Sequence, residues 1–317
     1  MERPQLIDVF RAHQTIKPHL PATPLIRYPA LDELTGAQVL VKHENLQPGG
    51  AFKVRGGINL VSQLGPDVRR AGVISASTGN HGLSVAYAGQ TFGVQARIVV
   101  PEGANPLKVA AIRRLGAEVL FWGKDFDEAR QHAEKVARER EYRYIHSGNE
   151  PLLIAGVATI TLEILQAAPQ VDTIIVPVGG GSGAAGACIA AKGINPAIQV
   201  IGVQAERAPA AYKSWKAKAI VEDKMETAAE GLATRVGFEL PQQILWDLLD
   251  DFVLVSEQEI SEAISIYIET ARTLAEGAGA APLAALLKMR PKLSGQTVAL
   301  ILSGGNITLP QLKAVLT

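Results

Sequence analysis

The sequence predicts an α/β fold with two lobes, each built on a doubly wound, mostly parallel sheet. Short apolar segments alternate with segments of helical periodicity over residues 73–146, and a second alternating series follows over residues 151–302. The composition agrees, because 47% of the 317 residues are hydrophobic and only 5% are aromatic. A core of Ala, Val, Ile and Leu is typical of helices packed on buried parallel strands.

The chain before residue 53 is predicted to begin with a helix and to reach a strand. Apolar residues recur at helical spacing over residues 6–19, and Pro21 ends this pattern. Residues 23–25, Thr-Pro-Leu, are expected to be an extended lead-in, and residues 37–42 a short strand. Residues 44–47 then connect this strand to the segment that contains Lys53.

Strand and helix signals alternate regularly between residues 54 and 146. Because consecutive units of this kind are joined by right-handed crossovers, a parallel sheet is predicted here. The expected helices are residues 54–64, 82–92, 107–115 and 126–139, and the expected strands are residues 73–75, 96–100, 118–121 and 142–146.

The second series is predicted to form the other lobe. Since no long linker separates the two series, the lobes should touch, and the functional site should lie in the cleft between them. The expected helices are residues 151–166, the segment after Gly183, and residues 257–275, the last with Ser256 as its cap. The expected strands are residues 173–178, 199–203, 252–255 and 297–302.

The charge balance excludes several classes of partner. Lys and Arg number 31, as do Asp and Glu, so no overall basic field attracts nucleic acid or an acidic membrane. The N-terminus lacks a signal pattern, and no apolar run is long enough to cross a membrane. The single cysteine, Cys188, fits a reducing compartment. We therefore expect a soluble cytoplasmic protein that acts on a small molecule.

Lys53 is the first candidate for chemistry. It follows the glycine pair Gly49-Gly50 and the ring of Phe52, and it precedes a predicted helix. A lysine that loses part of its hydration at such a place can lose its proton and condense with an aldehyde. When the segment is taken alone, a surface lysine at the start of a helix is the better explanation.

Two loops between a strand and a helix are candidates for binding anions. Residues 77–82, Ser-Thr-Gly-Asn-His-Gly, place hydroxyls, an amide and free N–H groups where a carboxylate could bind, and a simple helix cap explains them equally well. Residues 179–183, Gly-Gly-Gly-Ser-Gly, favour a phosphate over a merely flexible loop, because consecutive glycines let several N–H groups converge on one anion.

A different function is also open at the second loop. Residues 181–186 fit the glycine pattern of dinucleotide-binding folds, and Glu206 stands where an acid for the ribose is expected. A nicotinamide-dependent oxidoreductase of this kind gives Lys53 no role. Ser303 follows the last predicted strand and is expected to point into the ligand cleft, with a plain turn as the alternative. The histidines are scattered, and no metal site is predicted.

Taken together, four motifs resemble the fold-type II pyridoxal-phosphate enzymes, and within them the threonine/serine dehydratase and serine racemase branch. The motifs are residues 51–56, 77–82, 179–183 and 303–306, and residues 23–25, 101–119 and 154–156 also match, so that the resemblance covers essentially the whole chain. It implies a tryptophan synthase β-like fold with pyridoxal 5'-phosphate in the interdomain cleft, and a homodimer. The large cofactor-binding domain would be residues 1–52 and 147–317, and the small domain residues 53–146.

The resemblance also implies a role for each matching residue. Lys53 would hold the cofactor as a Schiff base and then act as the base at the substrate α-carbon, and Thr78 is a second candidate for moving a proton. The remaining cofactor-binding residues would be Phe52 beside the ring, Asn80 at its 3-hydroxyl, Ser303 at the pyridine nitrogen, Gly179, Gly180, Gly181, Ser182 and Gly183 around the phosphate, and Gly231 and Glu276 near the ring. The substrate carboxylate would be bound by Ser77, Thr78, Gly79, Asn80 and His81.

Some positions depart from the family's pattern. Ala51 replaces a common Ser. Thr78 stands where dehydratases often have Ala and racemases have Ser, so racemisation stays open. Gln204 and Ala210 stand where metal-activated relatives have carboxylate ligands, and we predict that this cation site is lost. A serine such as Ser303 does not hold the pyridine nitrogen protonated, which favours expulsion of a β-leaving group as the α-proton departs.

These observations predict a pyridoxal-phosphate lyase. The expected reaction is removal of water from a β-hydroxy-α-amino acid such as threonine or serine, which gives a 2-oxo acid and ammonia. An amino-acid racemase that uses the same site is the first alternative, and the nicotinamide-dependent oxidoreductase with residues 181–186 is the second. A non-catalytic ligand-binding α/β protein is a further alternative.

Overall fold

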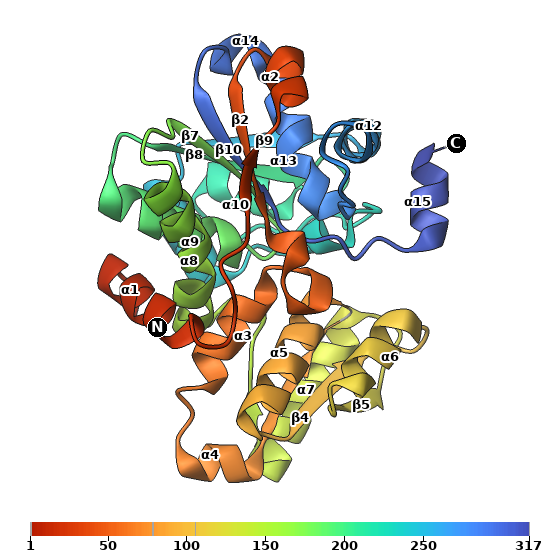
Figure 1. The fold of residues 1–317 in the computed structure, drawn as a ribbon. Helices are drawn as coiled ribbons and strands as arrows, with labels where there is room; N and C mark the ends of the chain where they lie inside the picture. The colour runs from red at the N-terminus through yellow and green to blue at the C-terminus, as the bar shows by residue number, and fades with distance from the viewer. Residues whose placement is uncertain (1, 78, 105, 317) are drawn as a thin grey trace.

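The computed structural model describes residues 2–77, 79–104 and 106–316 and contains two sheets (Figure 1). The larger sheet has six strands in the order β1-β2-β10-β7-β8-β9. Neighbouring strands in this sheet are parallel, except for the edge pair β1 and β2, which is antiparallel. The strands are β1 (Leu25–Arg27), β2 (Gln38–His43), β7 (Thr173–Pro177), β8 (Gln199–Ala205), β9 (Asp251–Val255) and β10 (Thr297–Leu302).

The smaller sheet has four parallel strands in the order β5-β4-β3-β6. They are β3 (Val73–Ala76), β4 (Ala96–Val100), β5 (Glu118–Phe121) and β6 (Arg143–Tyr144). Every residue of β3 is buried, as expected for a central strand covered on both faces. The parallel sheet predicted for this stretch is confirmed, and β4 and β5 have the predicted bounds.

Helices and helical turns connect these strands. The helices are α1 (Leu6–Ile16), α2 (Pro29–Thr35), α3 (Lys53–Val61), α4 (Pro66–Ala71), α5 (Asn80–Phe92), α6 (Pro106–Arg114), α7 (Phe126–Arg140), α8 (Pro151–Ala167), α9 (Ser182–Ile194), α10 (Ala210–Ala217), α11 (Glu239–Leu248), α12 (Glu257–Ile266), α13 (Gly277–Lys288), α14 (Arg290–Leu293) and α15 (Leu309–Leu316). The short turns are η1 (Glu44–Leu46), η2 (Pro48–Gly50), η3 (Glu230–Leu232) and η4 (Tyr267–Ala271).

Both sheets are covered on their two faces, so the predicted doubly wound α/β fold is confirmed. On the larger sheet, α8, α9 and α11 share one core with the strands, and α12 and α13 share the core of the opposite face. On the smaller sheet, α5 and α6 pack on one face and α7 on the other.

Helix α3 lies between the part of the molecule that contains the larger sheet and the part that contains the smaller one (Figure 1). It packs against α5, on the smaller sheet, and against α8, on the larger one. A single core cluster joins Ile16 of α1, Ile58 of α3, Ile98 of β4 and Leu153 of α8. The first residue of α3 is Lys53, so the candidate lysine stands at the junction of the two sheets.

The structure corrects some of the predicted elements. The helix predicted over residues 257–275 is wrong in its extent: α12 ends at Ile266, one π-helical turn follows, and Arg272 stops it with a left-handed φ of 53°. The predicted cap is confirmed, since the Ser256 side chain accepts a hydrogen bond from Glu259 N. The lead-in at residues 23–25 leads directly into strand β1. The sequence did not indicate α2, α4, α10, α11, α13, α14 or α15.

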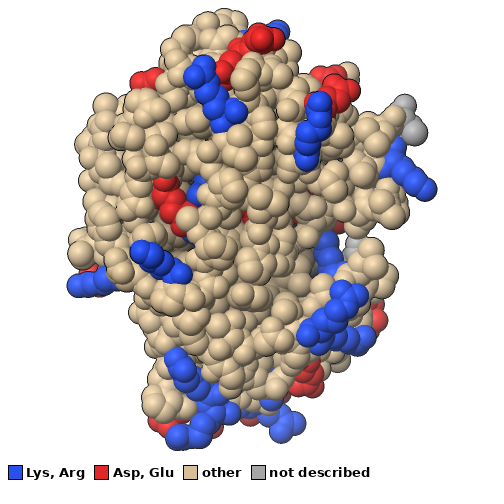
Figure 2. Space-filling model, viewed as in Figure 1, with Lys and Arg blue, Asp and Glu red and all other residues tan. Residues whose placement is uncertain are grey.

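The surface agrees with the neutral composition. Acidic and basic side chains are interspersed over the face that Figure 2 shows. Within the described ranges, none of the helices has the length and apolar character needed to cross a membrane.

Candidate active site

Lys53 begins α3, and protein groups surround its amine. The start of the helix is fixed through the preceding residue, because Phe52 N donates to Ser303 O at 2.9 Å. The Nζ atom donates to Ser147 O at 3.1 Å and to Ser182 Oγ at 3.0 Å. Part of the side chain is exposed, but burial of the amine lowers the pKa of Lys53 to about 8. A fraction of the amine is therefore neutral near neutral pH, which is the form that attacks an aldehyde.

The loop between β7 and α9 is shaped to hold an anion. Gly181 has a φ of 89°, a left-handed conformation that glycine adopts without strain. A side chain on Gly179 would overlap the Gly231 carbonyl oxygen, and one on Gly180 would overlap the ring of Phe238. The first N–H groups of α9 have no acceptors within the helix. Together with the helix dipole, these N–H groups make a cradle for a phosphate.

Phe52, Gly183 and Ser303 line one small cavity beside this loop. The Phe52 ring lies against Gly183, where an added Cβ would sit 3.2 Å from the ring. The same ring has its centroid 5.3 Å from Lys53 Nζ. Ser303 follows β10 directly and is buried. An aromatic ring, the start of α9 and a serine thus line this cavity, and the Lys53 amine lies near the same ring.

Asn80, the first residue of α5, is held by two other side chains. Its Nδ2 donates to Glu276 Oε1 at 2.6 Å, and its Oδ1 accepts from Asn306 Nδ2 at 2.8 Å. Asn306 Nδ2 also donates to Gly49 O at 2.7 Å. An amide nitrogen carries two hydrogens, so Asn80 keeps one N–H for a further acceptor.

Glu276, the N-cap residue of α13, is partly buried and has a desolvated carboxyl. Burial raises the pKa of Glu276 to about 7, against the opposing effects of the Lys108 charge and the hydrogen bond from Asn80. Gly231 is its neighbour, because an added Cβ there would lie 3.9 Å from Glu276 Oε1. This carboxyl therefore changes its charge near neutral pH while it touches Asn80.

Replacing Glu276 by glutamine is expected to remove one pH-dependent contribution to stability. The carboxyl ionises near its ordinary pKa of 4.5 in the unfolded chain and near 7 in the folded one. Between these values the folded state binds more protons than the unfolded state, so stability falls as the pH rises. The glutamine oxygen still accepts from Asn80, so the variant should gain on the wild type by at most about 3 kcal/mol over this range. Denaturant unfolding at a series of pH values measures this, and a constant difference would contradict the raised pKa.

The loop that opens α5 is held by its own side chains. Ser77 Oγ accepts from Gly79 N at 3.1 Å and from Gly82 N at 2.8 Å. The buried His81 ring places Nε2 3.4 Å from Ile145 O, and burial lowers the pKa of His81 to about 3. The Ser77 hydroxyl, the His81 ring and the N–H groups of Gly79 and Gly82 already have protein partners. The N–H groups of Asn80 and His81, which begin α5, are therefore the stronger candidates for binding a carboxylate.

Two ion pairs connect the helices of the smaller sheet with the segment between α10 and α11. Lys108 Nζ pairs with Glu230, and it lies near Gly79, where an added Cβ would be 3.5 Å away. Arg235 Nε pairs with Asp127 Oδ2 at 3.3 Å. These contacts hold the segment against α6 and α7, beside the loop of residues 77–82.

The structure brings most of the predicted site residues together. Ser77 and His81 lie on the same loop, but their side chains bind other protein groups, and Thr78 lies outside the described residues. Residues that sequence reasoning missed are Ser147, Lys108, Phe238 and Asn306; of these, Asn306 lies in one of the four motifs and Lys108 in the matching segment of residues 101–119. The residues that surround the site are Phe52, Lys53, Asn80, Gly179, Gly180, Gly181, Ser182, Gly183, Gly231, Glu276 and Ser303.

The donor set fits pyridoxal phosphate. The Lys53 amine suits an aldehyde, and the glycine loop, closed to side chains at Gly179 and Gly180, suits a phosphate. The Phe52 ring lies near both Lys53 and Gly183, and Ser303, which lines the same small cavity as Phe52, carries a neutral hydroxyl. The fold and the site therefore define a class of enzyme in which a lysine holds a phosphorylated aldehyde cofactor.

Comparison with known proteins identifies the family. The model of the pyridoxal-phosphate dependent enzymes matches residues 16–304, and the chain belongs to this family. The L-threonine ammonia-lyase of Thermotoga maritima is 38% identical over 98% of this chain and 78% of its own length. The structures of the T.th. threonine deaminase and of serine racemase from Dictyostelium discoideum each match with a TM-score of 0.91 over 96% of this chain and 99% of their own, at 36% and 33% identity. The predicted fold type and cofactor are confirmed.

The structure also bears on the predicted loss of the cation site and on the nicotinamide-dependent alternative. Gln204 Oε1 accepts from Tyr212 N at 3.0 Å, and Ala210 opens α10. Among the residues that the structure describes, no group of three or more His, Cys, Asp or Glu is placed to hold a metal ion. The loss of the cation site stays a prediction. Glu206 pairs with Lys288 at 3.3 Å, and the family match favours pyridoxal phosphate over nicotinamide at the glycine loop.

Proposed function

We propose that this chain is a dehydratase that converts a β-hydroxy-α-amino acid, such as threonine or serine, into a 2-oxo acid and ammonia. The observation that carries the proposal is the desolvated amine of Lys53, which contacts Ser182 at the glycine loop. The 38% identity to an L-threonine ammonia-lyase supports a lyase reaction at this site.

Lys53 is the residue that would hold the cofactor and take the α-proton of the substrate. When bound, pyridoxal phosphate supplies an electron sink for the bonds at the α-carbon. A pKa of about 8 suits a group that accepts and returns a proton near neutral pH. The Ser303 hydroxyl does not keep a ring nitrogen charged, which favours loss of the β-hydroxyl together with the α-proton.

The loop of residues 77–82 would orient the substrate. Its N–H groups at the start of α5 would bind the carboxylate and direct the α-C–H bond toward Lys53. The free N–H of Asn80 suits the 3-hydroxyl of the cofactor ring, with Gly231 and Glu276 beside it. The pair of Lys108 and Glu230 would help to exclude water from this side.

Release of a 2-oxo acid from a panel of β-hydroxy amino acids tests this function. The panel should contain threonine, serine, 3-hydroxyaspartate and an aryl-serine, with alanine as the control that lacks a leaving group. We expect a 2-oxo acid and an equal amount of ammonia from at least one hydroxy amino acid and none from alanine. Conversion of one enantiomer into the other without any 2-oxo acid would contradict the proposal.

A racemase is the second candidate, because a serine racemase is 33% identical over 96% of the chain. Racemisation needs a second group that delivers a proton to the opposite face of the α-carbon, and Thr78 carries a suitable hydroxyl. Thr78→Ala is expected to lower racemisation of serine at least about 10-fold while elimination stays within about twofold. Chiral chromatography and a 2-oxo acid assay on the same samples separate the two rates. An equal loss of both would show that one set of groups serves both reactions.

The wider organisation of the protein is part of the proposal. The large domain would comprise residues 1–52 and 147–317, which contain the six-stranded sheet, and the small domain residues 53–146, which contain the four-stranded sheet. We further propose a cytoplasmic homodimer that has no cation site and acts on a free amino acid.

A further inference from the structure

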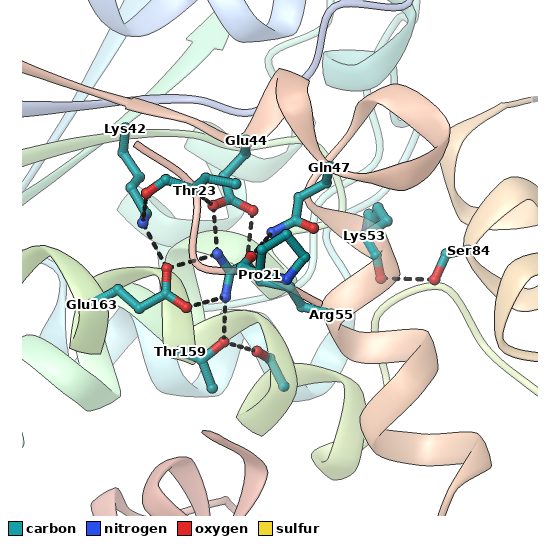
Figure 3. Close-up of polar contacts among 11 residues, drawn as sticks. Pro21, Thr23, Lys42, Glu44, Gln47, Lys53, Arg55, Ser84, Thr159 and Glu163 are labelled. Carbon is teal, nitrogen blue, oxygen red and sulfur yellow. Dashed lines mark hydrogen bonds and ion pairs between the residues drawn. The ribbon is translucent and has the colours of Figure 1, made fainter. Parts of the chain in front are cut away.

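Four charged side chains form a buried cluster to one side of Lys53 (Figure 3). Arg55, Lys42, Glu44 and Glu163 contribute two positive and two negative charges. Arg55 and Glu44 have no exposed side-chain surface, and Glu163 has 10%. Lys42 Nζ donates to Glu163 Oε2 at 2.6 Å. Each charged group is paired with an opposite charge of the same cluster, as buried charges require.

Arg55 is the centre of the cluster, and its five N–H groups are all bonded. Nε and Nη2 donate to the two Glu44 oxygens, each at 2.8 Å. Nη1 and Nη2 donate to the two Glu163 oxygens at 2.7 Å and 2.8 Å, and Nη1 also donates to Thr159 Oγ1 at 3.2 Å. Burial acts to lower the pKa of Arg55, but both glutamates outweigh it and raise that pKa. A lysine has neither the planar fork nor five donors, so it cannot reproduce this set.

Two of the three partners of Arg55, Thr159 and Glu163, lie on one face of α8. Gly156, Thr159 and Glu163 follow each other at spacings of three and four residues, which places them on the same side of the helix. A Cβ on Gly156 would lie 2.8 Å from Arg55 O and 2.8 Å from Gly56 Cα, so α3 and α8 touch through their backbones. The hydrogen bonds of Arg55 to Thr159 and Glu163 therefore fix the position of α3 along α8.

The opposite side of α3 is held just as closely. Ser84 Oγ, on α5, donates to Lys53 O at 2.7 Å. A Cβ on Gly57 would lie 2.7 Å from Ser84 O. Helix α3 is thus packed closely between α5, at Gly57, and α8, at Gly156. The first residue of this helix carries the amine that reaches Ser147 O and Ser182 Oγ.

We propose that Arg55 is a positioning residue for Lys53, and that the cluster of Lys42, Glu44, Arg55 and Glu163 sets the place of the amine by fixing the register of α3 against α8. The inference rests on the proposed function, since it assigns the cluster to that reaction. A buried ion pair often adds little to stability compared with apolar residues of the same volume, so stability alone does not account for four such charges. Precise placement of the Lys53 amine accounts for them, because an error of about 1 Å in the position of a reacting group can cost about 100-fold in rate.

Arg55→Lys tests this positioning role, because it keeps the charge and loses the fork. We expect kcat for 2-oxo acid release to fall by roughly 10- to 100-fold while KM stays within about threefold. The rate at which pyridoxal phosphate attaches to Lys53 in the cofactor-stripped chain should fall as well. That rate is measured by borohydride reduction and peptide mass, and it does not depend on which reaction the enzyme catalyses. A wild type that attaches the cofactor but releases no 2-oxo acid would therefore contradict the proposed function alone.

Lys192→Met is the matched control, because it breaks the ion pair of Lys192 with Asp250, at 2.7 Å, in the last turn of α9. It should lower the thermal midpoint and leave both rates within about twofold of the wild type. If Arg55→Lys does not fold, Thr159→Val removes a single acceptor and should reduce both rates by roughly threefold. The inference is overturned if the folded Arg55 variant, or Thr159→Val in its place, keeps both rates within twofold, or if Lys192→Met slows them as much.

Discussion

Lys53→Ala is expected to lower kcat/KM for 2-oxo acid release by at least about 10³-fold and to leave the protein without covalently held cofactor. The amine is the group that both holds the aldehyde and moves the α-proton in the proposed reaction. Its two hydrogen bonds, to Ser147 O and Ser182 Oγ, are the contacts of Nζ that the variant loses. The fold should therefore persist. Borohydride reduction followed by peptide mass analysis, together with the 2-oxo acid assay, measures both effects.

Lys213→Ala serves as the control for this experiment. Lys213 is half exposed and pairs with Asp223 on the surface, so its loss should change neither activity nor cofactor content. A Lys53→Ala protein that keeps its cofactor colour and full activity would show that another group holds the cofactor.

Gly179→Ala is expected to weaken the binding of pyridoxal phosphate about 100-fold, which corresponds to the loss of one or two hydrogen bonds to a charged group. The added Cβ would overlap the Gly231 carbonyl oxygen, and a backbone atom cannot move aside as a side chain would. The phosphate loop must shift instead, and its N–H groups then lose their convergence on the anion. Titration of the cofactor-stripped chain, followed by absorbance, gives the affinity.

Gly65→Ala is the matched control for the glycine loop. An added Cβ at Gly65 meets nothing within 4 Å, so this variant should bind the cofactor as the wild type does. Equal affinities of the Gly179 and Gly65 variants would mean that the loop does not hold the phosphate.

Most strands could be predicted from the sequence because they are short apolar runs between turn residues. Strands β4, β5 and β10 have the predicted bounds, and all of β10 is buried. Helix ends were harder to predict. Apolar spacing continues through residues 257–275, but the helix stops where Arg272 takes a left-handed conformation, which no periodic pattern reveals. Helix α13 was missed because Pro282 and two glycines interrupt an otherwise helical composition.

Most residues of the candidate site could be predicted from the sequence, but the hydrogen bonds among them could not. Ser77 shows the difference, because a hydroxyl before a helix fits a ligand site and a cap equally well, and the structure uses it to accept from Gly79 and Gly82. Asn80 was expected to face the cofactor, and its partners Glu276 and Asn306 lie 196 and 226 residues away along the chain. Arg55 lies in the motif of residues 51–56, but its pairing with Glu44 and Glu163 could not be predicted from the sequence.

By itself, the sequence determined the fold class and the motifs, because these depend on local patterns: apolar periodicity, glycines at strand ends, and a lysine before a helix. The cofactor followed from the resemblance of the four motifs to a known family. Only the tertiary structure decided which groups meet. Ser182 reaches Lys53 across 129 residues, and Glu163 reaches Arg55 across 108. Pairings of this kind arise because α3 packs between α5 and α8, which cover different sheets, and the same packing buries the amine and lowers the pKa of Lys53. Burial and charge pairing are properties of the folded assembly of segments, so no single segment of the sequence contains them.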